Sequence, residues 1–281
     1  MKKAAKIIFI ILGALLVYGS ILFFKLSDLR PDNYNYPNKP AKAKVLLVQM
    51  GQAHGIQFWD SIQTYTVSFE DEFYGFFGKQ AHPFKEQKME FSLQYIPNTF
   101  DGQLKIVSGI DSGIVWGIQS GETYTFNSEN RNVVMSNNED MVFWIPTYQY
   151  FIEFPKRIQE ATALDYIGEK TIDGIQVEGV LASWNSVDPQ KDTDQYVVWI
   201  AKETKRIVKI EYTVRDAYNF VLGAAAFKDY KTFNGIVLPS IYPVESNLVK
   251  DGLLHEMRIK DFKINNVSRE SLRPLDYKFL R

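Results

Sequence analysis

The stretch DQYVVWIAKETKRIVKIEYTVRD, from Asp194 to Asp216, predicts a β-hairpin. In its second half, apolar and polar residues alternate from Val208 to Arg215, which is the period of two expected of a strand with one face in water. The first half, Tyr196–Ile200, is apolar at every position, as in a strand flanked by other strands. Because one face of this hairpin is dry, another part of the chain or a ligand is expected to lie against it.

The composition predicts a folded protein that does not bind nucleic acid. The chain has 281 residues, of which 46% are hydrophobic and 15% aromatic, enough for one sizeable core or two small ones. The net charge is −1, and basic residues dominate the first thirty positions, so the remainder is mildly acidic. A body without a stripe of Lys and Arg lacks the electrostatic surface that nucleic acid requires.

The N-terminal segment predicts a membrane anchor. The sequence IIFIILGALLVYGSILFF, from Ile7 to Phe24, holds no charge for eighteen residues and follows three lysines. As a helix it would cross about 27 Å. Hydrophobic residues continue beyond the possible cleavage site at Val17-Tyr18-Gly19, so we predict an uncleaved transmembrane helix over residues 1–26. The lysines place the N-terminus in the cytoplasm and the bulk in the periplasm; the alternative is a periplasmic protein released by signal cleavage.

The absence of cysteine limits the chemistry of this chain. It excludes disulfides, thiolate metal sites, a cysteine nucleophile and a lipidated cysteine. The segment Leu29–Lys44 is rich in Pro, Asn and Lys and has no apolar period, so residues 27–42 are interpreted as a tether that holds the body clear of the bilayer. The body is then one domain over residues 43–281.

Periodicity in the body predicts a mainly antiparallel sheet. Apolar residues recur at spacings of three and four over Ala43–Tyr65, which predicts one helix, or two short helices broken at His54-Gly55. Alternating segments elsewhere predict about nine to eleven strands, with tight hairpin turns at Asp173-Gly174 and Asn234-Gly235. Because no long helical segments separate the strands, we expect an α+β fold with antiparallel pairing.

Two further stretches bear on a binding site. The aromatic segment Glu139–Phe154 does not alternate, and Pro146 and Pro155 are expected to bound or kink it, so one or two short helices are predicted there. Its aromatic residues form either core or a lid over a pocket. The run Gly223–Ala226 places small side chains on both faces of a predicted strand, and a closely packed helix or a ligand would fill the space.

No motif of the sequence indicates catalysis. The three histidines are far apart and lack zinc spacing, and the acidic segment Asp188–Gln195 is interpreted as a solvated turn and not a calcium loop. His54 is expected at a helix end. The chain has no nucleophile elbow, phosphate loop or dinucleotide motif, and no pair of carboxylates is marked by its spacing. We therefore predict a protein without enzymatic activity, cofactor or metal.

Short motifs spread over Ala43–Phe279 carry a family resemblance. They are Ala53-His54-Gly55 with Trp59, Tyr166-Ile167-Gly168-Glu169 with Ile172-Asp173-Gly174, Trp199-Ile200 with Thr204 and Arg206-Ile207, and Asp229-Tyr230-Lys231 with Asn234-Gly235-Ile236 and Leu238-Pro239. Together they resemble the outer-membrane lipoprotein-sorting superfamily of LolA- and LolB-like carriers. The resemblance implies an incomplete, half-open β-barrel of about eleven strands, wrapped around short helices, whose apolar cavity shelters acyl chains. This chain departs from the family in lacking cysteine and in its predicted anchor.

These inferences lead to one function and two alternatives. We predict a binder of lipid or of acylated lipoprotein, held at the cytoplasmic membrane by its N-terminal helix. The alternatives are an envelope interaction or sensory domain that holds a protein partner, and an envelope hydrolase. The predicted cavity and lid residues are Phe143, Trp144, Tyr148, Phe151, Trp199, Val208, Ile210, Tyr212, Ala224 and Ala226.

Overall fold

A computed structural model describes residues 13, 25–32, 34, 39–249 and 252–275 of the chain. The predicted anchor, Ile7–Phe24, lies outside the described residues except for Gly13. Within the ranges just given, no helix has both the length and the apolar content needed to cross a membrane.

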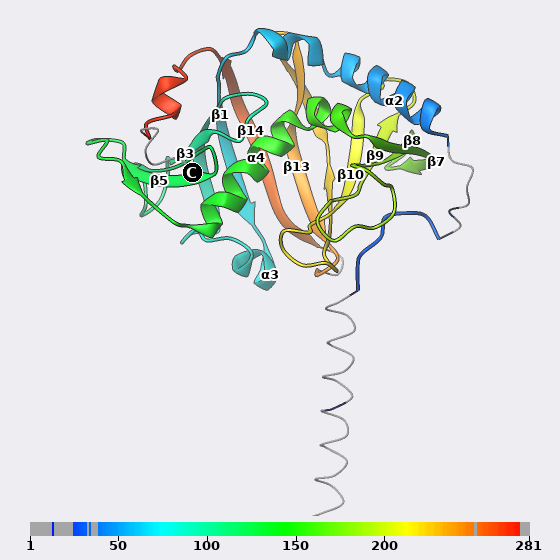
Figure 1. Ribbon diagram of the computed structural model, residues 1–281, viewed down its shortest axis with the longest axis horizontal. Coiled ribbons are helices and arrows are strands. Elements are labelled where there is room, and N and C mark those ends of the chain that lie inside the picture. Colours follow the sequence, from blue (N-terminus) through cyan, green and yellow to red (C-terminus); the bar gives the residue numbers. More distant parts are fainter. Residues whose placement is uncertain (1–12, 14–24, 33, 35–38, 250–251, 276–281) are drawn as a thin grey trace, which may run out of the picture.

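The described chain is built on one sheet of fourteen strands (Figure 1). The strand order is β6-β5-β4-β3-β2-β1-β14-β13-β11-β10-β9-β8-β7, with β12 beside β13, and every pairing is antiparallel. The sheet is curved but open, which confirms the predicted antiparallel, unclosed architecture. The strands are β1 (Tyr65–Phe73), β2 (Lys88–Tyr95), β3 (Gly102–Ile106), β4 (Ile114–Gln119), β5 (Glu122–Asn127), β6 (Val134–Met135), β7 (Ala163–Ile172), β8 (Ile175–Ser183), β9 (Tyr196–Ala201), β10 (Ile207–Thr213), β11 (Leu222–Ala226), β12 (Lys228–Phe233), β13 (Ile236–Ser246) and β14 (Leu253–Ile264).

The helices lie on the concave face and at the rims of the sheet (Figure 1). Helix α4 crosses the concave face, α2 packs on β7 and β8, and α3 follows β1 at the lower edge. The predicted break at His54-Gly55 is confirmed, because α2 ends just before it and a short 3-10 helix follows. The helices are α2 (Pro40–Ala53), η1 (Ile56–Ser61), α3 (Gly75–Gln80), α4 (Glu139–Arg157), η2 (Ile158–Glu160) and η3 (Glu270–Leu272).

The hairpin turns follow the sequence closely. β9 and β10 pair as the opening stretch predicts. Asp173 and Gly174 have φ of 48° and 81°, and Asn234 and Gly235 have φ of 50° and 86°. Two successive positive φ angles give the turn whose twist matches that of the flanking strands, and Asn, Asp and Gly adopt them most readily.

The sheet has fourteen strands, more than the nine to eleven that the sequence predicted. β6 has two residues, too few to show alternation. β11 and β12 come from one continuous stretch, and they pair with successive parts of β13, so the chain between them bends at Phe227. The backbone N–H of Phe227 donates to Val208 instead of to β13.

The aromatic segment forms a single helix of 19 residues, so the prediction of short helices was wrong. Asn138 caps it, since its side chain accepts a hydrogen bond from the Met141 N–H. Pro146 and Pro155 each remove one helical hydrogen bond. The helix continues because a whole face of it is buried against the sheet, and tertiary packing of this kind outweighs local preference.

Apolar side chains form cores on both sides of the sheet. The main core fills the concave face under α2 and α4, and a smaller cluster around Trp199 covers the outer face of β8 and β9. Leu29 and Tyr34 of the predicted tether pack against the outer cluster, and α2 already begins at Pro40. The described part of residues 27–42 therefore belongs to the folded domain.

Candidate ligand-binding pocket

A pocket of about 680 Å³ opens on the concave face beside α4. Strand register explains its position: Tyr212 pairs with Tyr196 and Gly223, and Gly223 pairs with Ser246 of β13. Two residues earlier on β13, Val244 pairs with His255 of β14. Side chains from β9, β10, β11, β13 and β14 thus meet at one level of the sheet. The N-terminal half of α4 covers them from above, and the space left between helix and sheet is the pocket.

Aromatic rings make up much of the pocket wall, and they show what lies against the apolar face of the β9–β10 hairpin. Its dry face contributes Tyr196, Ile210 and Tyr212 to the pocket. From α4, Phe151 meets Tyr212 edge to face with ring centroids 5.6 Å apart, and Tyr150 stacks on Tyr196 at 5.7 Å. The hairpin therefore covers both the helix and the pocket beneath it.

The small residue at Gly223 makes room for a neighbouring ring. A Cβ atom built on Gly223 would lie 2.5 Å from two ring carbons of Tyr212, which is closer than any side chain tolerates. The next residue that points to the concave face, Ala225, is fully buried in the main core. The space left by this run is thus filled by Tyr212 of the adjacent strand, which neither of the two predicted explanations included.

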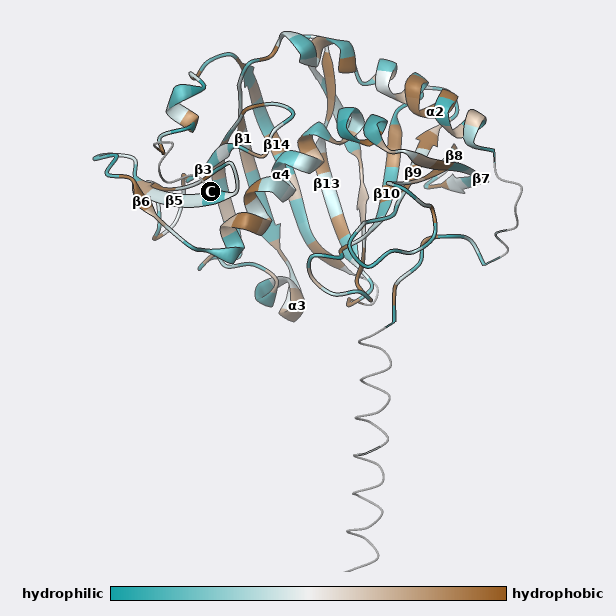
Figure 2. Cartoon of the chain, in the orientation of Figure 1, coloured by the Kyte–Doolittle hydropathy of each residue, from teal (hydrophilic) through white to brown (hydrophobic). Residues whose placement is uncertain are grey.

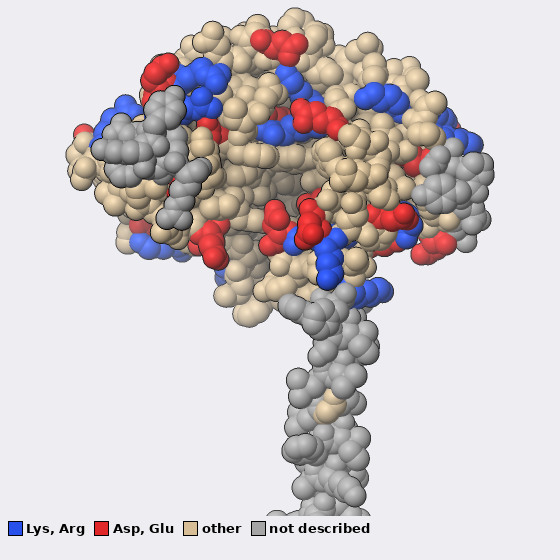
Figure 3. Space-filling view, viewed as in Figure 1, with Lys and Arg blue, Asp and Glu red and all other residues tan. Residues whose placement is uncertain are grey.

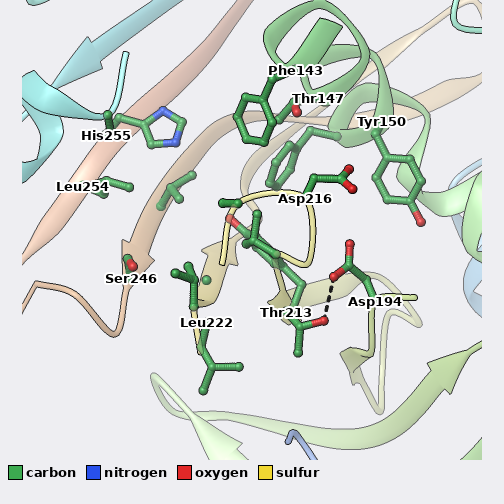
Figure 4. A pocket seen from close by; sticks show the side chains of 18 of the residues that line it. Phe143, Thr147, Tyr150, Asp194, Thr213, Asp216, Leu222, Ser246, Leu254 and His255 are labelled. Atoms are coloured by element: carbon green, nitrogen blue, oxygen red, sulfur yellow. Dashed lines mark hydrogen bonds between the residues drawn. The ribbon is translucent and has the colours of Figure 1, made fainter. Parts of the chain in front are cut away.

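One end of the pocket is acidic. Asp194 and Asp216 lie on the same side in Figure 4, facing Tyr150 of α4. The Asp194 carboxylate accepts hydrogen bonds from the Thr213 hydroxyl at 2.7 Å and from the Arg215 N–H at 2.9 Å. Burial nonetheless raises its pKa, and the negative charge of Asp216 acts in the same direction. Figure 3 shows acidic side chains along the rim of the hollow.

The opposite end carries a buried polar network. Asp71 is fully buried, and its carboxylate accepts a hydrogen bond from the Tyr148 hydroxyl at 2.8 Å. Its other oxygen lies 2.8 Å from His255 Nδ1, and His255 lines the pocket (Figure 4). Burial raises the pKa of Tyr148 far above its usual value, so this hydroxyl remains a donor. The network fixes the His255 ring at the pocket wall.

Comparison with models of known protein families and with curated protein sequences gives no match. Solved structures do match. An outer membrane lipoprotein-sorting protein domain from Vibrio parahaemolyticus aligns with a TM-score of 0.51 at 13% identity, over 84% of this chain and 98% of that one. The chain has the fold of lipoprotein-sorting domains. A DUF1329 family protein from Desulfovibrio piger aligns with a TM-score of 0.52 at 13% identity, over 87% and 100% of the two chains.

The fold resemblance inferred from short motifs is therefore confirmed. A LolA superfamily protein from Nitrosomonas europaea also matches, with a TM-score of 0.49 at 10% identity over 82% of this chain and 96% of that one. Identities this low establish the lipoprotein-sorting fold alone, because one fold supports many functions.

In this lipoprotein-sorting fold, five of the ten predicted residues line the pocket: Phe143, Trp144, Phe151, Ile210 and Tyr212. Tyr148 is fully buried between α4 and the sheet, where its ring packs on Phe69 and Phe91, so it belongs to the core and not to a lid. Trp144 and Phe151 are also nearly covered, at 6% and 8% exposure. In this structure α4 forms one wall of the pocket.

The other four predicted residues face away from the pocket. Trp199 and Val208 belong to the outer cluster, and the Trp199 indole N–H donates to Glu211 at 3.1 Å. A β-bulge between Ile207 and Lys209 moves Val208 out of phase with the rest of its strand. Ala224 and Ala226 pair with Glu211 and Lys209, which places them on the outer face.

Sequence reasoning missed the polar residues of the pocket, although one signal was available. Asp71 stands in phase with Val67, Phe69 and Phe73, so alternation alone places a carboxylate on the core face of β1. His255 likewise stands in phase with Met257 and Ile259 of β14, whereas no such signal marks Asp194. Among the described residues, no cluster of His, Cys, Asp or Glu has the arrangement of a metal site.

His54 has a structural role at the end of α2. Its Nδ1 lies 2.9 Å from the Val237 carbonyl, and its Nε2 accepts a hydrogen bond from the Ile207 N–H at 3.2 Å. The neutral ring with its proton on Nδ1 satisfies both partners. Burial lowers the pKa of His54 to about 4, so the ring joins the helix end to β10 and β13 as an uncharged group.

Proposed function

We propose that the protein binds one hydrophobic molecule in this pocket, either a lipid or the acyl chains of a lipoprotein, without transforming it. The pocket carries this proposal: it is apolar over most of its wall, concave and about 680 Å³ in volume. Binding sites for small hydrophobic ligands fall in the range of about 300–1,000 Å³. The similarity to a domain named for lipoprotein sorting supports the same class of ligand.

The cellular setting belongs to the proposal. The uncharged segment Ile7–Phe24 follows three lysines, so it would hold the folded domain on the periplasmic side of the cytoplasmic membrane. A tethered binder of this kind receives its ligand from, or passes it to, molecules within reach of that membrane.

The acidic end of the pocket narrows the choice of ligand. The described residues that line the pocket as a whole include Asp140, Asp194, Asp216 and Glu245 but no Lys or Arg. Glu245 is paired with Lys209 at 2.7 Å, whereas Asp216 is exposed at the mouth. A ligand whose polar end carries an amine or several hydroxyl groups would find hydrogen-bond acceptors there, and a free carboxylate would be repelled.

Photo-crosslinking of the full chain in its membrane tests the proposal. Phe143→p-benzoylphenylalanine places the reactive ketone in the pocket, and Val45→p-benzoylphenylalanine serves as control because Val45 is 56% exposed on α2. After irradiation, mass spectrometry should show a lipid adduct at position 143 that is much weaker at position 45. A protein adduct at position 143 would favour the interaction-domain alternative, and no adduct there would count against ligand binding.

Hydrolysis is a second candidate because two carboxylates share one side of the pocket. Asp194 has a raised pKa and Asp216 lies near it, as a general acid and a general base would. Incubation of the purified chain with acyl esters and envelope glycans tests this reading. Turnover that disappears in Asp194→Asn and Asp216→Asn would establish hydrolysis. If the substrates stay intact, hydrolysis is excluded and ligand binding is the remaining function.

A further inference from the structure

We infer that the lower edge of the sheet docks on the membrane surface, so that the pocket opens directly toward the lipid. This inference rests on the proposed lipid binding and tether. We call this region the mouth edge: it consists of α3, the loop of residues 214–221 and the loop of residues 247–249. In Figure 1 these segments lie together at the bottom of the domain, where the blue ribbon of residues 25–32 enters it.

The start of the domain is fastened to the mouth edge. Ser27 is buried, and its backbone N–H and hydroxyl donate to the Asn219 carbonyl at 2.8 and 3.0 Å. The Arg215 guanidinium donates to the Ser27 carbonyl at 2.6 Å and to its hydroxyl at 2.8 Å. Residues 214–218 and Val221 of the same loop, apart from Arg215, line the pocket. One loop therefore holds Ser27 and borders the mouth. We call the described N-terminal segment, residues 25–32, the strap.

The position of Ser27 limits the distance between the mouth and the bilayer. The uncharged segment ends at Phe24, three residues before Ser27. A fully extended chain of three residues spans roughly 11 Å. If Ile7–Phe24 crosses the membrane, Ser27 and the loop that holds it lie within roughly 11 Å of the end of that segment, whatever conformation the intervening residues adopt.

The mouth edge also exposes large apolar side chains. On α3, Phe76 is 73% exposed and Phe77 50%, and on the two loops Tyr218 and Leu248 are 53% and 41% exposed. α3 is held to the sheet because the Tyr74 N–H donates to the Leu254 carbonyl at 2.9 Å. The colouring of Figure 2 shows hydrophobic residues on α3 at this edge. Apolar side chains gathered on one edge indicate an interaction surface.

These side chains are continuous with the interior of the pocket. Phe77, Tyr218 and Leu248 line the pocket and are also exposed at its rim. An acyl chain that leaves a bilayer in contact with this rim would remain against apolar groups until it reaches Phe143 and Tyr212. Transfer through water would instead expose the apolar chain, which is unfavourable in proportion to the apolar area exposed.

The charges of the mouth edge are mixed. Lys79 and Asp216 are exposed there, and Lys25 is exposed two residues before Ser27. Binding driven by a strong basic patch would need anionic lipid and would weaken with salt. Here the exposed apolar side chains and the uncharged segment Ile7–Phe24 are sufficient to hold the mouth edge on the membrane, so docking is expected on neutral lipid as well.

Single-cysteine labelling tests the inference, because the natural chain has no cysteine to remove. The full chain is reconstituted in phosphatidylcholine vesicles with an environment-sensitive fluorophore on Phe76→Cys or Leu248→Cys. The control is Val45→Cys, which is exposed on α2 at the opposite edge of the sheet in Figure 1. Emission from positions 76 and 248 should shift to the blue, and nitroxide-labelled lipids should quench it several-fold more than emission from position 45.

The outcomes separate docking from ligand binding. Probes at 76 and 248 that behave like the probe at 45 would overturn docking, even if position 143 still crosslinks to lipid. If the probes at 76 and 248 are immersed in lipid but position 143 gives no lipid adduct, docking is supported and the proposed ligand binding is contradicted. A chain that does not float with the vesicles would overturn both the tether and the docking.

Discussion

The Arg215 guanidinium donates a hydrogen bond to the backbone carbonyl of Ser27, 188 residues earlier in the chain. Through a second nitrogen it reaches the Ser27 hydroxyl and the Asn219 carbonyl, at 2.8 and 2.6 Å. One side chain thus joins the N-terminal strap to the loop at the pocket mouth. A planar guanidinium is suited to this because its donors point in fixed directions.

Removal of this link should release the strap. Arg215→Met leaves the Ser27 carbonyl without its charged donor, and hydrogen bonds to charged groups contribute about 1.5–3 kcal/mol each. Hydrogen exchange in residues 25–32 should become at least tenfold faster, while the strands keep their protection. Arg131→Met is the control, since Arg131 is exposed on a distant loop. Equal exchange in both variants would contradict the role of Arg215.

His54 should make stability depend on pH below neutrality. Its pKa is about 4 in the folded protein against 6.5 for a free histidine, so between these values only the unfolded chain takes up the proton. Stability therefore falls as the pH decreases from 6.5 to 4, by about 3 kcal/mol from this residue. Urea unfolding of His54→Gln should show a lower stability at neutral pH and a flatter profile in this window. A parallel profile would exclude His54 as the cause.

Gly223 should be intolerant of any side chain because of Tyr212. In Gly223→Ala the ring must move from its place, and overpacking of this kind costs about 1–3 kcal/mol. The double variant Tyr212→Leu/Gly223→Ala should lose less stability than the sum of its two single variants, because the clash is absent. Ala226→Val, on the outer face of the same strand, is the control and should change stability by less than about 0.5 kcal/mol. Additive losses in the double variant would refute the clash.

Glu153 should be the most sensitive carboxylate of α4. It is buried, burial raises its pKa, and it accepts hydrogen bonds from Tyr65, Gln149 and Arg157 at 2.7–2.9 Å. Glu153→Ala leaves the Arg157 charge unpaired in the interior, which typically costs about 3–5 kcal/mol. Glu139→Ala removes an exposed carboxylate from the first turn of the same helix and should cost less than about 1 kcal/mol. Thermal unfolding compares the two, and similar losses would argue against the buried network.

Asp216 should affect which ligands bind. Asp216→Asn removes an exposed negative charge at the mouth without a change in shape. Labelling of the pocket by a photoreactive alkylamine should decrease several-fold, and labelling by a fatty acid of equal length should stay constant or increase. Glu129→Gln, an exposed change far from the pocket, serves as control. An unchanged ratio of amine to acid would remove the acidic end from ligand selection.

The sequence by itself determined the local elements of this protein. Alternation over Val208–Arg215 predicted the hairpin, Asp-Gly and Asn-Gly predicted the turns, and His54-Gly55 marked the break after α2, because each depends on neighbours a few residues apart. Antiparallel pairing followed from the absence of long helices between the strands. Motifs at these sites also identified the lipoprotein-sorting fold.

The tertiary structure alone decided what the pocket contains. The bulge at Val208 reversed a face that strict alternation had placed inward, and the packing of α4 outweighed two prolines. Asp194 and Asp216 flank one local hairpin, but His255 lines the same pocket only because β14 reaches the level of β9 and β10 in one sheet. Such contacts depend on register across strands far apart in the chain, and neither periodicity nor local propensity carries information on register over that distance.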